Sequence, residues 1–187
     1  MVNSNENLNT TFTALFKDPV NAEKAYNLAV QKGYKKEDIN ILMSEDTKRK
    51  NYGTPLGDME ENNVFGHKLM EGAGVGGAIG TTTGAIAGAI AAIGTTLVLP
   101  GLGLVIAGPI AVGLAGAGAG GIAGGILGAL ANAGFPESHA KDYEKALIEG
   151  GIVISITSRS KDIDLALENE WKSYGGENFL HKQVVNT

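Results

Sequence analysis

A long glycine-rich tract without charge occupies the middle of this 187-residue chain. From Gly72 to Pro136 the sequence contains 20 glycines and no Asp, Glu, Lys, Arg or His. Glycine costs about 1 kcal/mol per residue relative to alanine inside a helix, so the tract cannot form a stable isolated helix in water. Packing or a membrane must supply the missing stability. This requirement limits the architectures that the chain can adopt.

Glycines in the tract recur at every fourth residue, on either side of a turn signal at Leu99–Gly103. This spacing predicts a helical hairpin with arms at about 70–99 and 104–133. Each arm would be about 40 Å long at 1.5 Å per residue, enough to cross a hydrocarbon core of about 30 Å. The two glycine registers are Gly72, Gly76, Gly80, Gly84 and Gly88, and Gly116, Gly120, Gly124 and Gly128.

Bulky residues form a narrow ridge beside each glycine register. The ridges contain Ile79, Ile86, Ile90 and Ile93 on the first arm and Ile122 and Ile126 on the second. Small residues spaced by four allow helix backbones to approach closely. We therefore expect these glycines and isoleucines to form a helix–helix or oligomer interface. A flexible linker is the weaker interpretation, because a coil would have no use for the register or the ridge.

The flanks of the tract have the pattern of a small domain with strands and helices. Strands are predicted at 11–16, 39–43 and 152–157, and the tail at 179–185 could be an edge strand. Helices are predicted after Pro19, at 136–149 and at 163–171. The predicted fold is α+β, a small ferredoxin-like α/β sandwich that a glycine-zipper helical hairpin interrupts.

This pattern divides the chain into three parts. Residues 1–10 form a disordered arm, 11–63 and 134–187 form one discontinuous α/β sandwich domain, and 64–133 form the hairpin insertion. Residues 44–63 read as an exposed linker, and we expect Tyr143 and Trp171 to be core residues. The other expected core residues are Phe12, Leu15, Leu28, Ile39, Ile41, Leu147, Ile152, Ile154 and Ile156.

The composition argues against most kinds of chemistry. The absence of cysteine excludes disulfides, thiolate nucleophiles and sulfur-based metal sites, and the three histidines are scattered. No basic block could neutralise phosphates, so we expect no nucleic-acid binding. The G-x-G-x-x-G match at 72–77 follows residues that look helical, whereas a dinucleotide fingerprint follows a strand. We expect no catalytic, cofactor-binding or metal-binding residues and no small-molecule substrate. The polar start lacks an apolar segment, so no cleavable signal peptide is expected.

One stretch resembles bacterial general stress proteins of the heat-induced type. It begins at Gly134-Phe-Pro136-Glu137, continues through Tyr143-Glu144 and Leu147, and ends at Gly150-Gly151-Ile-Val-Ile. The turn LVLPGLGLVIAGPIA also resembles the centre of those proteins. The resemblance covers about residues 11–158, without the linker at 44–63. It implies a stress-associated protein, with no enzymatic activity or cofactor to transfer.

Two functional classes remain open from the sequence. In the first, the hairpin inserts into the bacterial inner membrane and self-associates, with the α/β domain facing the cytoplasm. In the second, the protein is a soluble, cytoplasmic structural protein whose hairpins are buried between subunits of a filament, shell or large oligomer. Both classes predict a homo-oligomer, because a single hairpin cannot cover its own apolar surface.

Overall fold

The first flank of the tract folds as a strand, a helix and a second strand. In the computed structural model, which describes residues 10–52, 86, 89, 96–99, 102–111, 125–158 and 161–183, β1 is Thr10–Phe16, α1 is Pro19–Gln31 and β2 is Ile39–Ser44. A short 3-10 helix, η1 (Lys36–Asp38), precedes β2. The side chain of Asp18 accepts a hydrogen bond from the Val20 N–H at the start of α1, and Pro19 occupies the first turn. The predicted strands and helix of this flank are confirmed.

The second flank supplies the strand that completes the centre of the sheet. It consists of α8 (Glu137–Ile148), β5 (Ile152–Thr157), α9 (Lys161–Ser173) and β6 (Glu177–Gln183). The strand order is β3-β4-β2-β5-β1-β6, and all neighbouring strands are antiparallel. Ile156 of β5 lies opposite Phe12 of β1 on one side and Ile39 of β2 on the other. The two flanks therefore alternate within one sheet.

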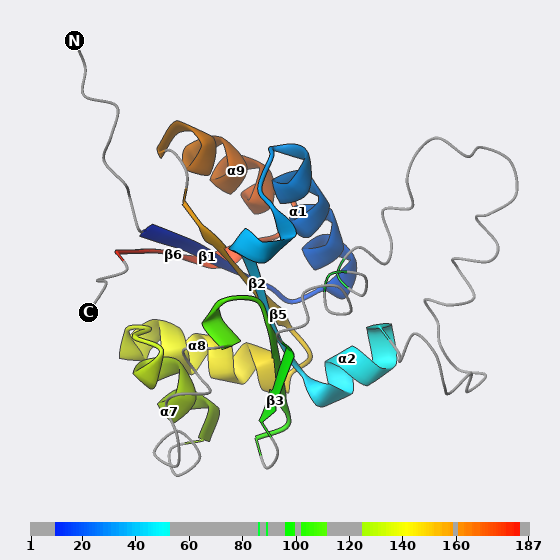
Figure 1. Ribbon diagram of the computed structural model, residues 1–187. Coiled ribbons are helices and arrows are strands. Elements are labelled where there is room, and N and C mark those ends of the chain that lie inside the picture. The colour runs from blue at the N-terminus through cyan, green and yellow to red at the C-terminus, as the bar shows by residue number, and fades with distance from the viewer. Residues whose placement is uncertain are drawn as a thin grey trace, which may run out of the picture.

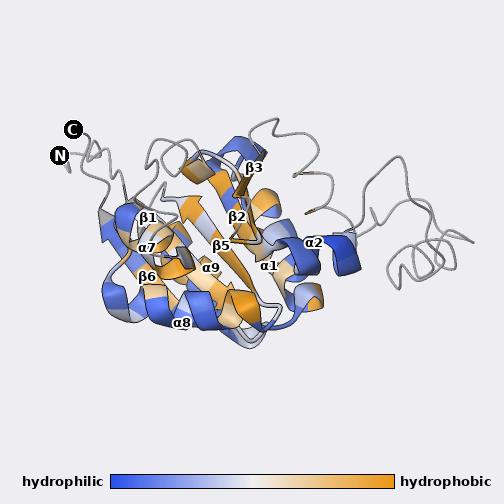
Figure 2. Ribbon diagram, turned by 90° about the horizontal axis from the view of Figure 1, so that it is seen from below, coloured by the Kyte–Doolittle hydropathy of each residue, from blue (hydrophilic) through white to orange (hydrophobic). Residues whose placement is uncertain are grey.

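Helices cover both faces of this sheet (Figure 1). One apolar core joins α1 and α9 to the strands, with Tyr26 and Trp171 as its largest buried side chains. The other core joins α7 (Gly125–Asn132) and α8 to the opposite face, around Tyr143 and Phe135. In Figure 2 the inner strands β2 and β5 are largely hydrophobic, whereas α8 is mixed. The fold is mixed α/β.

A ferredoxin-like sandwich, with helices on one face only, is not confirmed. The physical reason lies in β5 and β2, which place apolar side chains on both faces of the sheet, so that both faces require cover. Ile152, Ile154 and Ile156 belong to the first core and Val153 to the second. The predicted core residues are buried, apart from Leu28, which is partly buried against the first core.

The predicted helical hairpin is wrong at the turn that joins its arms. Thr96–Leu99 is strand β3 and Leu104–Ala107 is strand β4, and the two form a β-hairpin that extends the sheet from β2. Gly103, with φ +58°, lies in the turn. The Pro-Gly signal correctly predicts a turn, but the residues on either side of it form strands, of which β4 pairs with β2. The tract therefore contributes to the sheet itself.

The predicted linker at 44–63 begins with a helix instead. Helix α2 spans Glu45–Tyr52, where Ser44 accepts a hydrogen bond from the Thr47 N–H at 3.1 Å. Two acidic residues open this helix and two basic residues close it, which complements the helix dipole. Apolar periodicity missed α2 because only Thr47 is buried along it. Residues 53–63 and residues 1–9 of the predicted arm at 1–10 lie outside the described residues, and Thr10, the last residue of that arm, begins β1 instead.

A close approach between backbones at Gly108 provides a test of how tightly the tract is attached. Its φ is +106°, and an added Cβ would lie 2.6 Å from the Ile39 carbonyl oxygen. We expect Gly108→Ala to lower the free energy of unfolding by about 2–4 kcal/mol, because strain and a backbone clash combine. Gly103→Ala is the matched control, since nothing lies within 4 Å of its added Cβ. Urea denaturation measures both, and equal losses would contradict this account.

Candidate functional site

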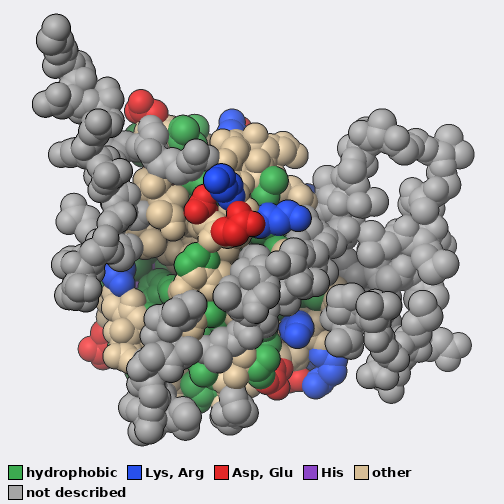
Figure 3. All heavy atoms as spheres, in the orientation of Figure 1, with side chains coloured by type: hydrophobic (Ala, Val, Ile, Leu, Met, Phe, Trp, Pro, Cys, Tyr) green, Lys and Arg blue, Asp and Glu red, His purple; other side chains and the backbone are tan. Residues whose placement is uncertain are grey.

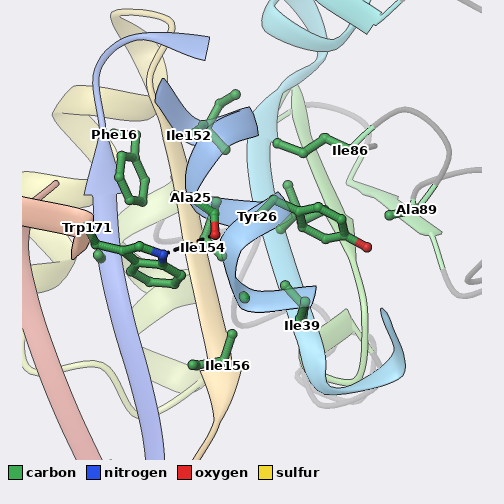
Figure 4. Packing of buried hydrophobic residues seen from close by; sticks show 14 of the residues in the cluster. Phe16, Ala25, Tyr26, Ile39, Ile86, Ala89, Ile152, Ile154, Ile156 and Trp171 are labelled. Carbon is green, nitrogen blue, oxygen red and sulfur yellow. Dashed lines mark hydrogen bonds between the residues drawn. The ribbon is translucent and has the colours of Figure 1, made fainter. Parts of the chain in front are cut away.

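Three residues of the predicted interface fall within the described part of the chain. Ile86 is fully buried in the core beneath α1, together with Tyr26 and Ala89 (Figure 4). Ile126 is buried in the opposite core, and Gly128 is half-buried on α7. The two isoleucines therefore pack against the α/β layers of their own chain. The remaining predicted interface residues lie outside the described residues: Gly72, Gly76, Gly80, Gly84, Gly88, Gly116, Gly120, Gly124, Ile79, Ile90, Ile93 and Ile122.

The carboxylate of Glu23 binds the backbone of Ile86, the first described residue of the tract. Glu23 is on α1 and only 2% exposed. Its two oxygens lie 3.2 and 3.4 Å from the N–H of Ile86, a helical residue 63 positions away in sequence. A buried carboxylate requires hydrogen-bond donors, and a buried backbone N–H requires an acceptor. Each group therefore satisfies the other across the boundary between flank and tract.

Asn40 holds the second segment, where the chain turns from β4 into helical residues 110–111. The side-chain oxygen of Asn40 accepts a hydrogen bond from the Ile110 N–H at 2.7 Å. Its amide nitrogen donates to the Ser155 carbonyl at 3.2 Å, and Asn40 is 3% exposed. The Thr13 hydroxyl donates to the Ser155 hydroxyl at 2.8 Å. A buried polar row thus runs across the three central strands and ends on the tract.

Two charged side chains hold the ends of the third segment, α7. Near its start, Glu144 of α8 accepts a hydrogen bond from the Leu127 N–H at 3.1 Å. At its end, the Lys182 ammonium of β6 donates to the Ala133 carbonyl at 2.7 Å and lies over the Phe135 ring. A negative group at the start of a helix and a positive group at its end both match the helix dipole. Burial lowers the pKa of Lys182.

We call Glu23, Asn40, Glu144 and Lys182 the tract anchors. They share one property: each is a flank side chain that binds a backbone group of the tract. The tract has no charged residue of its own with which to cap its helices. Backbone groups are the same for every residue type, so the anchors hold the tract whatever its side chains.

Sequence analysis missed all four anchors, although two of them leave a signal. Asn40 interrupts the otherwise apolar run INILM, as Ser155 interrupts IVISIT. Polar residues inside buried strands generally have a hydrogen-bond partner. Glu23 lies three positions before Tyr26, on the apolar side of its helix. Glu144 and Lys182 leave no such signal, because they lie in charged, amphipathic segments.

The other buried polar groups hold the flanks together. Asp164 of α9 accepts hydrogen bonds from the Tyr34 hydroxyl, at 2.8 Å, and from the Ser158 hydroxyl. Tyr143 and Trp171 are core residues as predicted. The Tyr143 hydroxyl donates to the Asn178 carbonyl at 2.7 Å, and the Trp171 indole donates to the Ala25 carbonyl at 3.0 Å. These contacts join α9 to α1 and to two loops, and α8 to β6.

Metal and phosphate sites have little support in the described part of the chain. Among those residues no group of three or more His, Cys, Asp or Glu side chains could hold a metal ion. His139 and His181 are at the surface, where His181 pairs with Glu168 at 3.1 Å. Figure 3 shows basic and acidic side chains side by side on one face, without a single-sign patch. The predicted absence of catalytic and cofactor-binding residues stays a prediction.

Comparison with known proteins identifies no relative. No family model, no curated protein and no solved structure matches this chain. In the ranges that the structure describes, no helix combines the length and the apolar character needed to cross a membrane.

Removal of the Glu23 carboxylate tests the most deeply buried of the four anchors. We expect Glu23→Ala to lower the free energy of unfolding by about 2–3 kcal/mol, because the Ile86 N–H loses a charged acceptor and stays buried. Glu23→Gln keeps one acceptor oxygen and should lose less. Glu37→Ala, at an exposed acidic residue of η1, controls for the change in net charge. A loss no larger than that of Glu37→Ala would show that Glu23 does not anchor the tract.

The same core makes a prediction for alkaline solution. Burial, with a contribution from the charge of Glu23, raises the pKa of Tyr26 from 10.0 to about 12. The unfolded chain therefore ionises first, and stability that is complete below pH 10 should fall as the pH rises toward 12. The Tyr26 hydroxyl has no hydrogen-bond partner among the described residues, so Tyr26→Phe should be tolerated at neutral pH. Denaturation at several pH values should show a shallower alkaline loss for this variant than for the parent.

Proposed function

We propose that this protein is a non-enzymatic, self-associating structural protein in which the glycine-rich tract joins copies of the chain. The observation that carries the proposal is the attachment of the tract to the sheet through β3, β4 and the tract anchors. A tract attached at so many points is held in place on the α/β domain. Such attachment suits a surface that is presented to a partner.

The part of the tract most suited to joining copies is the stretch between Ala111 and Gly125. Both of these residues are held by the fold, and the 13 residues between them include six glycines and no charged side chain. Small side chains permit close approach of backbones, which supports contact with another copy. The second glycine register, at Gly116, Gly120 and Gly124, falls in this stretch.

Insertion of the tract into a membrane is the less favoured alternative. Two continuous helical arms would require β3 and β4 to leave the sheet and to lose their pairing with each other and with β2. They would also remove Leu104 and Ile106 from the core beneath α8. Assembly between copies requires neither change. For this reason we favour a cytoplasmic assembly over a protein of the inner membrane.

The proposed role in stress rests on the resemblance described above, in particular on the segment from Gly134 to Ile154. A non-enzymatic role is supported by the use of the buried polar groups. Glu23, Asn40, Asp164 and Glu144 all accept hydrogen bonds from groups of the protein itself. These side chains are thereby committed to holding the fold.

Size measurement tests the proposal directly. Light scattering on detergent-free protein should give a particle several times larger than the 19.3 kDa chain. Gly120→Leu should reduce that mass, because the larger side chain separates backbones that glycine lets approach. Ala131→Leu places the same side chain at an exposed position of α7 and should leave the mass unchanged.

Two results would count against this function. A monodisperse monomer of the parent protein would exclude self-association in any form. Protein that stays with the membrane fraction after a carbonate wash, and leaves it only in detergent, would favour the inserted hairpin instead.

A further inference from the structure

The two edges of the sheet differ in how they are protected. Edge strands expose unpaired backbone groups, and natural proteins guard them with charges, bulges or irregular backbone. The edge at β6 has all three. Glu177 pairs with Lys17 at 2.7 Å, the register with β1 shifts between Thr13 and Leu15, and Asn178 has a φ of 52°. This edge is unsuited to pairing with another strand.

The edge at β3 lacks such protection. Its sequence, TLVL, has no charged residue and no proline, and the nearest charged residue is more than twenty positions away in either direction. In the described part of the chain β3 pairs with β4 alone. Val98 of this strand is 42% exposed. The strand is apolar and extended, and among the described residues its outer edge has no paired strand.

From this contrast we infer that β3 pairs antiparallel with β3 of a second copy, which joins two sheets across a two-fold axis. The inference rests on the proposed self-association and names one surface for it. An uncharged strand is compatible with itself, because self-pairing opposes no like charges. Every existing strand pair is antiparallel, so the new pair continues the same pattern. A two-fold contact of this kind uses the same surface on both copies and joins them in pairs within the assembly.

The burial of side chains falls from β4 to β3 at this edge of the sheet. Only β4 separates β3 from β2, and the side chains of β4 are buried on both faces. On β3, by contrast, Leu99 is only partly buried and Val98 is exposed. A second copy would extend both helical layers past this edge and cover these side chains. Another segment of the same chain could instead cover the β3 edge. The experiments below distinguish that case from pairing between two copies.

The first experiment introduces charge at the proposed interface. Val98→Lys places two ammonium groups close to the two-fold axis and should halve the particle mass measured by light scattering. Val20→Lys is the matched control, since Val20 is 43% exposed on α1 and lies at neither edge of the sheet. The control should keep the mass of the parent protein. Urea denaturation of both variants checks that they remain folded.

The second experiment uses the absence of cysteine from the chain. Single cysteines are placed at Thr96, Leu97, Val98 and Leu99 in turn, with Val20→Cys as the control. Directly opposed residues of an antiparallel pair lie within disulfide reach. Mild oxidation should therefore give a covalent dimer for the variant nearest the two-fold axis and little for its neighbours or the control.

The outcomes distinguish this inference from the broader proposal. A parent protein that is a monomer overturns both. A parent protein that associates, with no crosslink at any of the four positions and an unchanged mass for Val98→Lys, overturns only the β3 interface. That result would mean that a segment of the same chain covers the edge, or that copies meet elsewhere. Halved mass together with a position-specific crosslink supports the inference.

Discussion

The pairing of β5 with both β1 and β2 is the interaction on which the rest of the structure depends. β1, α1 and β2 are adjacent in sequence, yet the two strands do not touch, because β5 lies between them. The chain must therefore pass through the whole tract before its central sheet can close. This arrangement ties the folding of the flanks to the path of the tract. It also explains why the tract could not be an independent insertion in the parts that the structure describes.

The lack of charge in the tract has a second consequence, at its helix ends. Helices need acceptors for their first N–H groups, and this tract has no carboxylate to provide them. The flanks provide them instead, through Asn40 and Glu144, and Glu23 likewise accepts a hydrogen bond from the buried N–H of helical Ile86. A sequence that is poor in caps and rich in glycine is thus held by side chains elsewhere in the chain. Stability lost to glycine is offset by contacts of the backbone with the flanks.

Much of the fold was predictable because it follows local patterns. Asp18-Pro19 marks the start of α1, and the apolar runs at Ile39 and Ile152 mark strands that the structure confirms. Prediction failed where a segment has little pattern of its own. Helix α2 buries only Thr47, and β3 and β4 are short apolar segments whose conformation depends on the pairing of β3 with β4 and of β4 with β2. The helical arms predicted from the four-residue glycine spacing extend across the residues that form β3 and β4.

The sequence by itself determined the separation into charged flanks and an uncharged tract, the strands and helices of the flanks, and the residues of their cores. These follow from periodicity and from the cost of exposing apolar side chains. Only the tertiary structure decided the strand order, the cover on both faces and the residues that hold the tract. The reason is that these depend on contacts between distant positions, such as Glu23 with Ile86 and Asn40 with Ile110. A carboxylate or an amide looks the same in sequence whether it faces water or a buried N–H, and its partner is chosen only when the chain folds.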